Sequence, residues 1–127
     1  MTLFHLCFIW EERVEKLSAK IEYLQKEIRV YLDGEIDHHS TGLIRVSIDD
    51  AIMHKRPQLL VLDFKSVTFM DSSGIGLVMG RYKLMRTVGG RIRVQNLSPG
   101  AYKVMKLAGL ERLGEIKQRE AAVNENY

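Results

Sequence analysis

One short segment gathers the residues best suited to chemistry, Asp71-Ser72-Ser73-Gly74-Ile75-Gly76. It follows an apolar run at residues 59–64 that is typical of a buried parallel strand, and it opens a helical repeat of apolar residues. The first turn of a helix leaves backbone N–H groups unpaired and carries a positive partial charge. Asp71 or Ser72 can cap those groups, and Ser73 would then stand exposed in the first turn.

Three glycines fall within the helix that this segment opens, at Gly74, Gly76 and Gly80. Each costs about 1 kcal/mol of helix stability relative to alanine. Their number suggests that another group approaches the backbone closely. Helix–sheet packing beside a capping cluster is the competing interpretation, and spacing alone favours it.

The sequence around Ser73 does not match two familiar catalytic motifs. A nucleophile elbow requires a glycine two residues before its serine, and a phosphate-binding loop requires a Gly-Lys-Ser/Thr sequence; neither is present here. His38 and His39, with Glu35 and Asp37, could ligate a metal. We expect the two adjacent histidines to point apart, and no cysteine or further histidine lies at ligand spacing. We therefore predict no catalytic residue, no metal ligand and no enzyme activity.

The composition indicates one globular domain. The chain has 127 residues, 46% of them hydrophobic, and a net charge of +3. Lysine and arginine are interspersed with acidic residues, so we expect no direct contact with nucleic acid. The basic stretch from Arg81 to Arg86 suits one helix face and a partner with an acidic patch.

The N-terminus and the cysteine content indicate where the protein works. A single cysteine, Cys7, forms no internal disulfide, so a reducing cytoplasm is expected. The apolar run at residues 3–10 is too short to span a bilayer and lacks the features of a signal peptide. We expect no membrane insertion and no export.

The N-terminal third admits two interpretations. Residues 28–32 alternate with period two and are β-branched or aromatic, as in a strand. We favour a β-hairpin over residues 20–37, with a helix only before about Ser18. The competing helix rests on a heptad seam, formed by Trp10, Val14, Leu17, Ile21, Leu24, Ile28 and Tyr31.

The rest of the chain alternates helices with strands, which predicts an α/β fold with a mixed sheet of about four to five strands covered by about three to four helices. Ser40 or Thr41 can cap the first helix, and Gly89-Gly90 can end the second. Asp33-Gly34 suggests a β-bulge. In order, the elements after the hairpin are a helix over 40–54, a strand over 59–64, a helix over 75–88, a strand over 91–95, a helix over 98–109 and a packed segment over 110–116.

Three stretches together carry a resemblance to a known family. They are residues 34–40 (Gly-Glu-Ile-Asp-His-His-Ser), residues 67–76 around Met70-Asp71-Ser72-Ser73-Gly74, and residues 80–83 (Gly-Arg-Tyr-Lys). At this spacing the chain resembles the stage II sporulation protein AA family, whose members are anti-sigma factor antagonists with a STAS domain. Family members open with two strands, which supports the hairpin.

The resemblance implies a domain organisation. It covers roughly residues 19–117, which we assign as the STAS domain. Residues 1–18 would be an extension of uncertain structure, and 118–127 a polar, frayed tail. Because residues 1–13 have no counterpart in the family pattern, we expect their deletion to leave stability nearly unchanged.

The resemblance also implies a mechanism. A partner anti-sigma factor, itself an ATP-dependent serine kinase, would phosphorylate Ser73. The unphosphorylated form would bind this kinase and release a sporulation sigma factor, and a serine phosphatase would reset the switch. The chain would bring no cofactor of its own. A STAS module that binds a nucleotide or small ligand as a sensor is the alternative.

Roles for individual residues follow from the same resemblance. Asp37 and Asp71 correspond to acidic positions beside the phosphorylated serine, and Ser72 and Gly74 flank it. The residues expected to meet the kinase lie on the following helix, at Gly76, Gly80, Arg81 and Tyr82.

Overall fold

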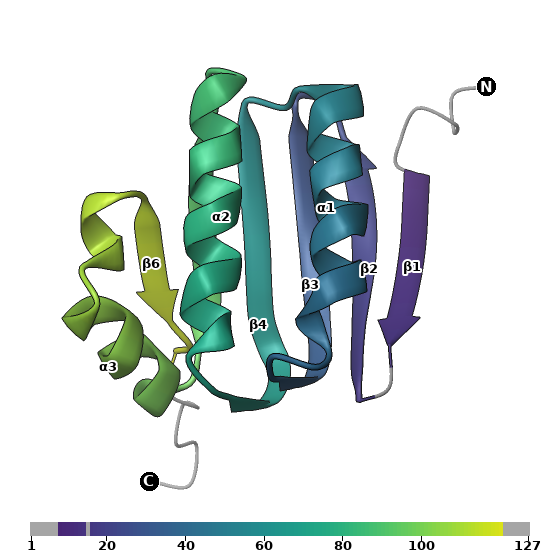
Figure 1. Ribbon diagram of the computed structural model, residues 1–127. Helices are drawn as coiled ribbons and strands as arrows, with labels where there is room; N and C mark the ends of the chain where they lie inside the picture. Colours follow the sequence, from purple (N-terminus) through teal and green to yellow (C-terminus); the bar gives the residue numbers. More distant parts are fainter. Residues whose placement is uncertain (1–7, 15, 121–127) are drawn as a thin grey trace, which may run out of the picture.

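The architecture is one mixed sheet with helices packed against it (Figure 1). The structure, a computed structural model, describes residues 8–14 and 16–120. Six strands lie side by side in chain order: β1 (Phe8–Val14), β2 (Leu17–Leu24), β3 (Glu27–Ile36), β4 (Leu59–Met70), β5 (Arg91–Leu97) and β6 (Glu115–Gln118). The helices are α1 (Thr41–Lys55), α2 (Ser73–Thr87) and α3 (Pro99–Leu107), with a 3₁₀ turn, η2 (Leu110–Arg112).

The strand directions divide the sheet into two parts. The strands β1, β2 and β3 are antiparallel neighbours, whereas β3, β4, β5 and β6 run parallel. Parallel neighbours need a crossover connection, and α1, α2 and α3 supply the three crossovers. The predicted α/β fold with a mixed sheet and a β2–β3 hairpin is therefore confirmed.

The sheet has more strands than the sequence predicted, because both ends of the chain add one. The proposed helix before Ser18 is wrong: residues 8–14 form β1, which pairs with β2 along its whole length. The boundary placed between residues 18 and 19 falls inside β2. At the other end, β6 begins within the packed segment expected over 110–116 and ends at Gln118, the first residue assigned to the tail. Residues 121–127 lie outside the described part of the chain.

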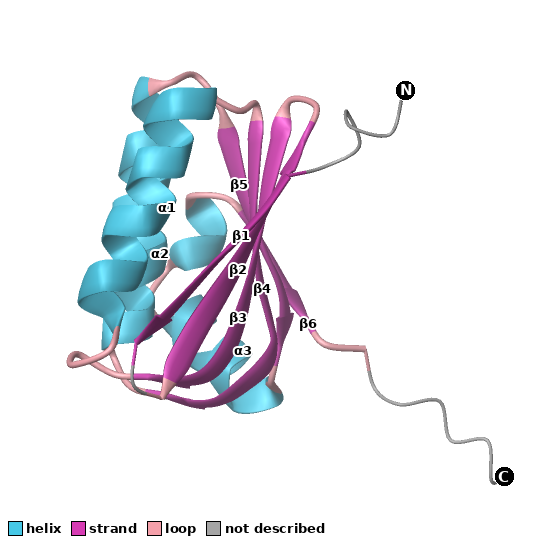
Figure 2. Ribbon diagram, turned by 90° about the vertical axis from the view of Figure 1, so that its right-hand side faces the viewer, coloured by secondary structure: helices cyan, strands magenta, loops and turns pink. Residues whose placement is uncertain are grey.

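The two faces of the sheet differ in character. Figure 2 shows α1 and α2 together on one side of the sheet. Alternate residues of β3 point to this side and are buried, namely Ile28, Val30 and Leu32. Their neighbours Arg29 and Tyr31 point to the opposite side, which neither α1 nor α2 covers. The core therefore lies between the sheet and the two long helices.

Local contacts set the ends of the elements. Arg56 adopts a left-handed conformation (φ 47°) and donates its N–H to the Ile52 carbonyl, which ends α1. The Ser98 hydroxyl accepts the Ala101 N–H at 3.1 Å and caps α3. At Gly34, φ is +116°, and a Cβ would stand 1.9 Å from the Lys16 carbonyl oxygen. The β3–β4 register shifts at this glycine, which confirms the predicted irregularity.

No helix in the described residues is long and apolar enough to cross a membrane.

Candidate functional site

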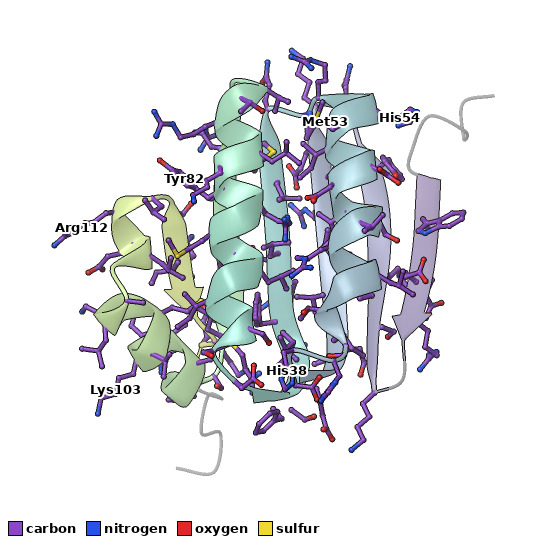
Figure 3. The ribbon with its side chains drawn as sticks, in the orientation of Figure 1. His38, Met53, His54, Tyr82, Lys103 and Arg112 are labelled. Atoms are coloured by element: carbon purple, nitrogen blue, oxygen red, sulfur yellow. The ribbon has the colours of Figure 1, made fainter. Side chains whose placement is uncertain are left out.

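The predicted site residues meet at one edge of the sheet. Because β3 and β4 are parallel neighbours, their carboxyl ends lie together, and α1 and α2 both begin there. The Asp71 N–H donates to the Ile36 carbonyl at 3.0 Å and joins the two loops. His38, at this end of the molecule in Figure 3, has its Nδ1 3.9 Å from Asp71 Oδ2.

Ser73 stands in the first turn of α2 and is held by Asp71. One carboxylate oxygen, Asp71 Oδ1, accepts both the Ser73 hydroxyl at 2.5 Å and the Ser73 backbone N–H at 2.8 Å. These two donors, the hydroxyl above all, hold the pKa of Asp71 below its usual value. Asp71 is therefore the side chain that caps α2, whereas Ser72 occupies the cap position without a side-chain hydrogen bond.

Asp37 accepts backbone N–H groups in the loop before α1, as Asp71 does before α2. Its carboxylate accepts the N–H groups of His39 and Ser40, each at 2.9 Å. Partial desolvation raises the pKa of Asp37, but these donors outweigh it, so the pKa lies below its usual value. The expected cap by Ser40 or Thr41 is wrong, because the Ser40 hydroxyl instead donates to the Glu35 carbonyl at 3.0 Å.

Known proteins resemble this chain over most of its length. The STAS domain family matches residues 19–123. The anti-sigma F factor antagonist of Paenibacillus polymyxa is 35% identical over 104 residues, covering 82% of this chain and 89% of that protein. The antagonist of the same name from Lysinibacillus sphaericus is 37% identical, covering 74% and 81%.

Solved structures give the same answer. The anti-sigma factor antagonist SpoIIAA in its unphosphorylated form superposes with a TM-score of 0.66 at 31% identity, covering 94% of this chain and 92% of that one. The phosphorylated form of SpoIIAA from Bacillus gives a TM-score of 0.62 at the same identity, with 94% of this chain covered and 100% of that one. This chain is a STAS domain. Its relatives place it among the anti-sigma factor antagonists.

In this STAS domain the three helix glycines have different surroundings. Gly74 is buried, and a Cβ there would meet Met70 Cγ and Sδ at 2.4 Å. Gly76 and Gly80 have open space where a Cβ would stand. At Gly74, the group that approaches the backbone closely is thus a side chain of the same domain. Gly76 and Gly80 instead leave the α2 backbone accessible from outside.

Arg81 departs from the expected arrangement. It is 6% exposed and points inward rather than toward a partner. Its Nε lies 2.7 Å from Asp49 Oδ1, and its NH2 donates to Asp49 Oδ2 at 3.2 Å. Arg81 NH1 donates to the Leu77 carbonyl at 3.2 Å. The ion pair joins α1 to α2. The role of Asp49 could not be predicted from sequence, because no local pattern links residues this far apart.

Tyr82 has a more accessible place on α2. It projects from the side of the helix that faces away from α1 (Figure 3) and is half-buried. The Arg86 guanidinium lies 5.9 Å from the centre of its ring, within the range of a cation–π contact.

The two histidines beside the site do not point apart as expected. The ring centres of His38 and His39 are 4.0 Å apart and the rings are tilted by 39°. Even so, no group of three or more His, Cys, Asp or Glu side chains within residues 8–14 and 16–120 is arranged to hold a metal ion.

Proposed function

We propose that this chain is an anti-sigma factor antagonist that phosphorylation of Ser73 switches off. The phosphate donor would be ATP bound by a partner anti-sigma factor acting as a serine kinase. The observation that carries the proposal is Ser73 itself: a partly exposed hydroxyl in the first turn of a helix, oriented by Asp71 at 2.5 Å. The two similar SpoIIAA structures, one of the unphosphorylated and one of the phosphorylated form, support it.

Phosphorylation would remove the bond that orients the serine. The hydroxyl hydrogen that Ser73 donates to Asp71 is replaced by phosphorus, so this hydrogen bond is lost. The new group carries about −1.5 to −2 charges beside the Asp71 carboxylate. Repulsion would therefore turn the phosphate away from Asp71 and toward the surface that a partner contacts.

The fold should survive this change, while the partner interface should not. The positive end of a helix favours an anion by about 0.3–1 kcal/mol, and the carboxylates of Asp37 and Asp71 oppose it. Docking, in contrast, would bury a dianion against a surface complementary to a neutral hydroxyl, and an unpaired buried charge costs several kcal/mol. Since about 1.4 kcal/mol is tenfold in affinity, the interface decides the outcome.

The neighbouring residues would have distinct roles in this switch. Asp37 holds the adjacent loop and contributes negative charge at the same edge. Gly76 and Gly80 would let the kinase approach the α2 backbone, and Tyr82 would contact it from the flank of the helix. Arg81 would act indirectly, by fixing α2 against α1. A serine phosphatase would restore the free hydroxyl.

Variants at Ser73 test the proposal. Ser73→Asp should fold normally but bind the kinase far more weakly, whereas Ser73→Ala should bind and resist phosphorylation. Ser72→Ala is the matched control, because Ser72 makes no capping bond and should still leave Ser73 able to accept phosphate. Each variant is titrated against the kinase beside a thermal melt. Tight binding by Ser73→Asp, or loss of binding through unfolding alone, would contradict the mechanism.

The same variants test the expected absence of catalysis. Purified protein should hydrolyse neither esters nor nucleotides faster than Ser73→Ala does. Turnover that disappears in Ser73→Ala would make Ser73 a nucleophile rather than an acceptor of phosphate.

A further inference from the structure

The strand β4 is longer than its pairing with β5. It pairs with β3 as far as Met70, but its pairing with β5 ends at Asp63. Asn96 has a positive φ of 60°, and Leu97, the residue after it, pairs with β6 but not with β4. Within the described part of the chain, residues 65–70 therefore have a strand neighbour on one side and none on the other.

A groove of about 710 Å³ runs along this free edge. One wall is the C-terminal half of β4, from Phe64 to Met70. The other is the first half of α3, which lies beside the lower part of the sheet (Figure 1). Each wall contributes one apolar side chain with substantial exposure: Phe69 at 52% and Val104 at 44%. An apolar surface beside unpaired strand edges is an arrangement that proteins normally cover.

The charge of the groove is entirely positive. Lys65 and Arg119 line it, and no described acidic residue does. Arg119 NH2 donates to the Lys65 carbonyl at 2.9 Å, and the Lys65 N–H donates to Asp63 Oδ1 at 2.9 Å. The main-chain groups of Lys65 are therefore occupied, and the guanidinium marks the end at which the free edge begins. Its Nε is buried and has no hydrogen-bond partner among the described residues.

We propose that this groove binds an extended segment of a partner protein, which adds as a strand alongside residues 66–70 of β4. Main-chain hydrogen bonds to the free edge would hold the segment, as in other strand-addition complexes. An aliphatic side chain would pack between Phe69 and Val104, and an acidic side chain would pair with Lys65 and Arg119. This inference goes beyond the switch at Ser73 and does not depend on it.

The groove adjoins the first turn of α2 through the side chain of Met70. Met70 lines the groove and also fills the space beside Gly74, the residue after Ser73. A bound segment would therefore touch the side chain that supports the first turn of α2. A partner could engage the groove and the Ser73 edge at the same time.

Three capped heptapeptides test the proposal on the full-length protein. The first alternates valine with glutamate, the second replaces glutamate with lysine, and the third is the acidic peptide with two prolines that cannot form strand hydrogen bonds. Binding is measured by fluorescence anisotropy and mapped by amide NMR. The acidic peptide should bind with a dissociation constant below about 1 mM, at least about tenfold tighter than the other two. Its NMR shifts should map to residues 66–70 and α3.

Two variants on α3 separate the groove from the rest of the helix. Val104→Glu should lower the affinity about tenfold, because it places an anion among the apolar contacts of the segment. Leu107→Glu is the matched control: it is 79% exposed on the same helix but does not line the groove, so binding should be unchanged. Lys65→Glu provides a second, independent disruption. Ser73→Ala should bind like the wild type, which separates this proposal from the phosphorylation switch.

Four peptide-binding results would overturn the proposal. They are no binding at about 1 mM, equal binding of all three peptides, NMR shifts that map to another surface, and equal losses in Val104→Glu and Leu107→Glu. Self-association of the protein that Val104→Glu abolishes would also overturn it, because a second copy would then be the occupant.

Discussion

At the scale of single residues, one carboxylate organises the proposed switch. Asp71 Oδ1 accepts both the hydroxyl and the backbone N–H of Ser73. The same contact therefore caps α2 and orients the hydroxyl that would receive phosphate. A change in the Ser73 side chain should therefore shift the pKa of Asp71. That pKa can be measured without a partner protein.

We predict that Ser73→Ala raises the pKa of Asp71 toward its ordinary value, because the Ser73 hydroxyl is the main cause of the lowered pKa. A carboxylate with a lowered folded-state pKa contributes stability above its unfolded pKa and loses that contribution as the pH falls through the folded one. In the wild type this contribution should therefore persist to lower pH than in Ser73→Ala. The measurement is a titration of the Asp71 carboxyl carbon by NMR.

Asp37 is the internal control for this titration. Its donors are the N–H groups of His39 and Ser40, which Ser73→Ala leaves in place. The pKa of Asp37 should not move. A shift at Asp37, or none at Asp71, would show that Ser73 does not hold the Asp71 carboxylate in solution.

Of the local contacts, the sequence rules predicted the cap by Asp71 but not the arrangement before α1, where the Ser40 hydroxyl bonds to the Glu35 carbonyl. Asp71 and Ser73 are two positions apart, so capping rules predict their contact. The role of Arg81 escaped prediction because its partner, Asp49, lies on another helix. A basic residue in a helical pattern is normally solvated, and only the packing of α1 on α2 shows that this one is buried.

At the scale of elements, the Arg81–Asp49 pair fixes one helix against the other. Burial is the largest influence on both groups: it lowers the pKa of Arg81 and, despite the arginine, raises the pKa of Asp49. The attraction between the two charges therefore offsets the cost of removing each of them from water, and either charge left alone would bear that cost unpaired.

We predict that Arg81→Met lowers the free energy of unfolding by about 1–3 kcal/mol, because it leaves the Asp49 carboxylate without its cation. Asp49 remains 35% exposed, so water moderates the loss. The double variant Arg81→Met with Asp49→Leu should recover much of the stability. Chemical denaturation measures both. If kinase binding stays lost in a stable double variant, Arg81 contacts the partner directly.

The elements at the two ends of the chain could not be predicted because their evidence is not local. Trp10 and Ile21 fit a heptad, yet they are opposed residues of β1 and β2. β1 lies at the sheet edge, and its residues 9–13 are exposed or half-buried, so no alternation of buried and exposed residues marks it. The four residues of β6 are too few to show any period. The strand predicted over 59–64 is the part of β4 that is buried on both faces, whereas its more exposed continuation to Met70 was not predicted.

At the scale of the whole molecule, the sheet face opposite α1 and α2 is polar and internally paired. Tyr31 donates its hydroxyl to Glu22 at 2.9 Å, and Arg93 Nε lies 2.9 Å from Glu115 Oε1. Each pair spans two neighbouring strands. Because its polar groups are satisfied in this way, the face does not need a further layer of helices.

The position of β1 reverses our expectation for the N-terminus. Removing residues 1–13 should lower the free energy of unfolding by about 2–3 kcal/mol, because it uncovers Ile21 and removes the half-buried Trp10. It would also free the edge of β2, so self-association should increase. Denaturation and light scattering measure the two effects. Glu12→Gln is the control, since it keeps β1 and alters only the carboxylate that accepts the Ser47 hydroxyl. An unchanged stability would mean that β1 does not contribute to the folded sheet.

Two glycines of this fold imply different evolutionary histories. At Gly74 the space for a Cβ is filled by the Met70 side chain, which can itself be exchanged. Alanine at position 74 should thus appear in lineages that carry a smaller residue at position 70, and the two positions should covary. At Gly34 the obstacle is the Lys16 carbonyl oxygen, a backbone atom that every residue type shares. No second substitution can remove it, so position 34 should stay glycine while its neighbours diverge.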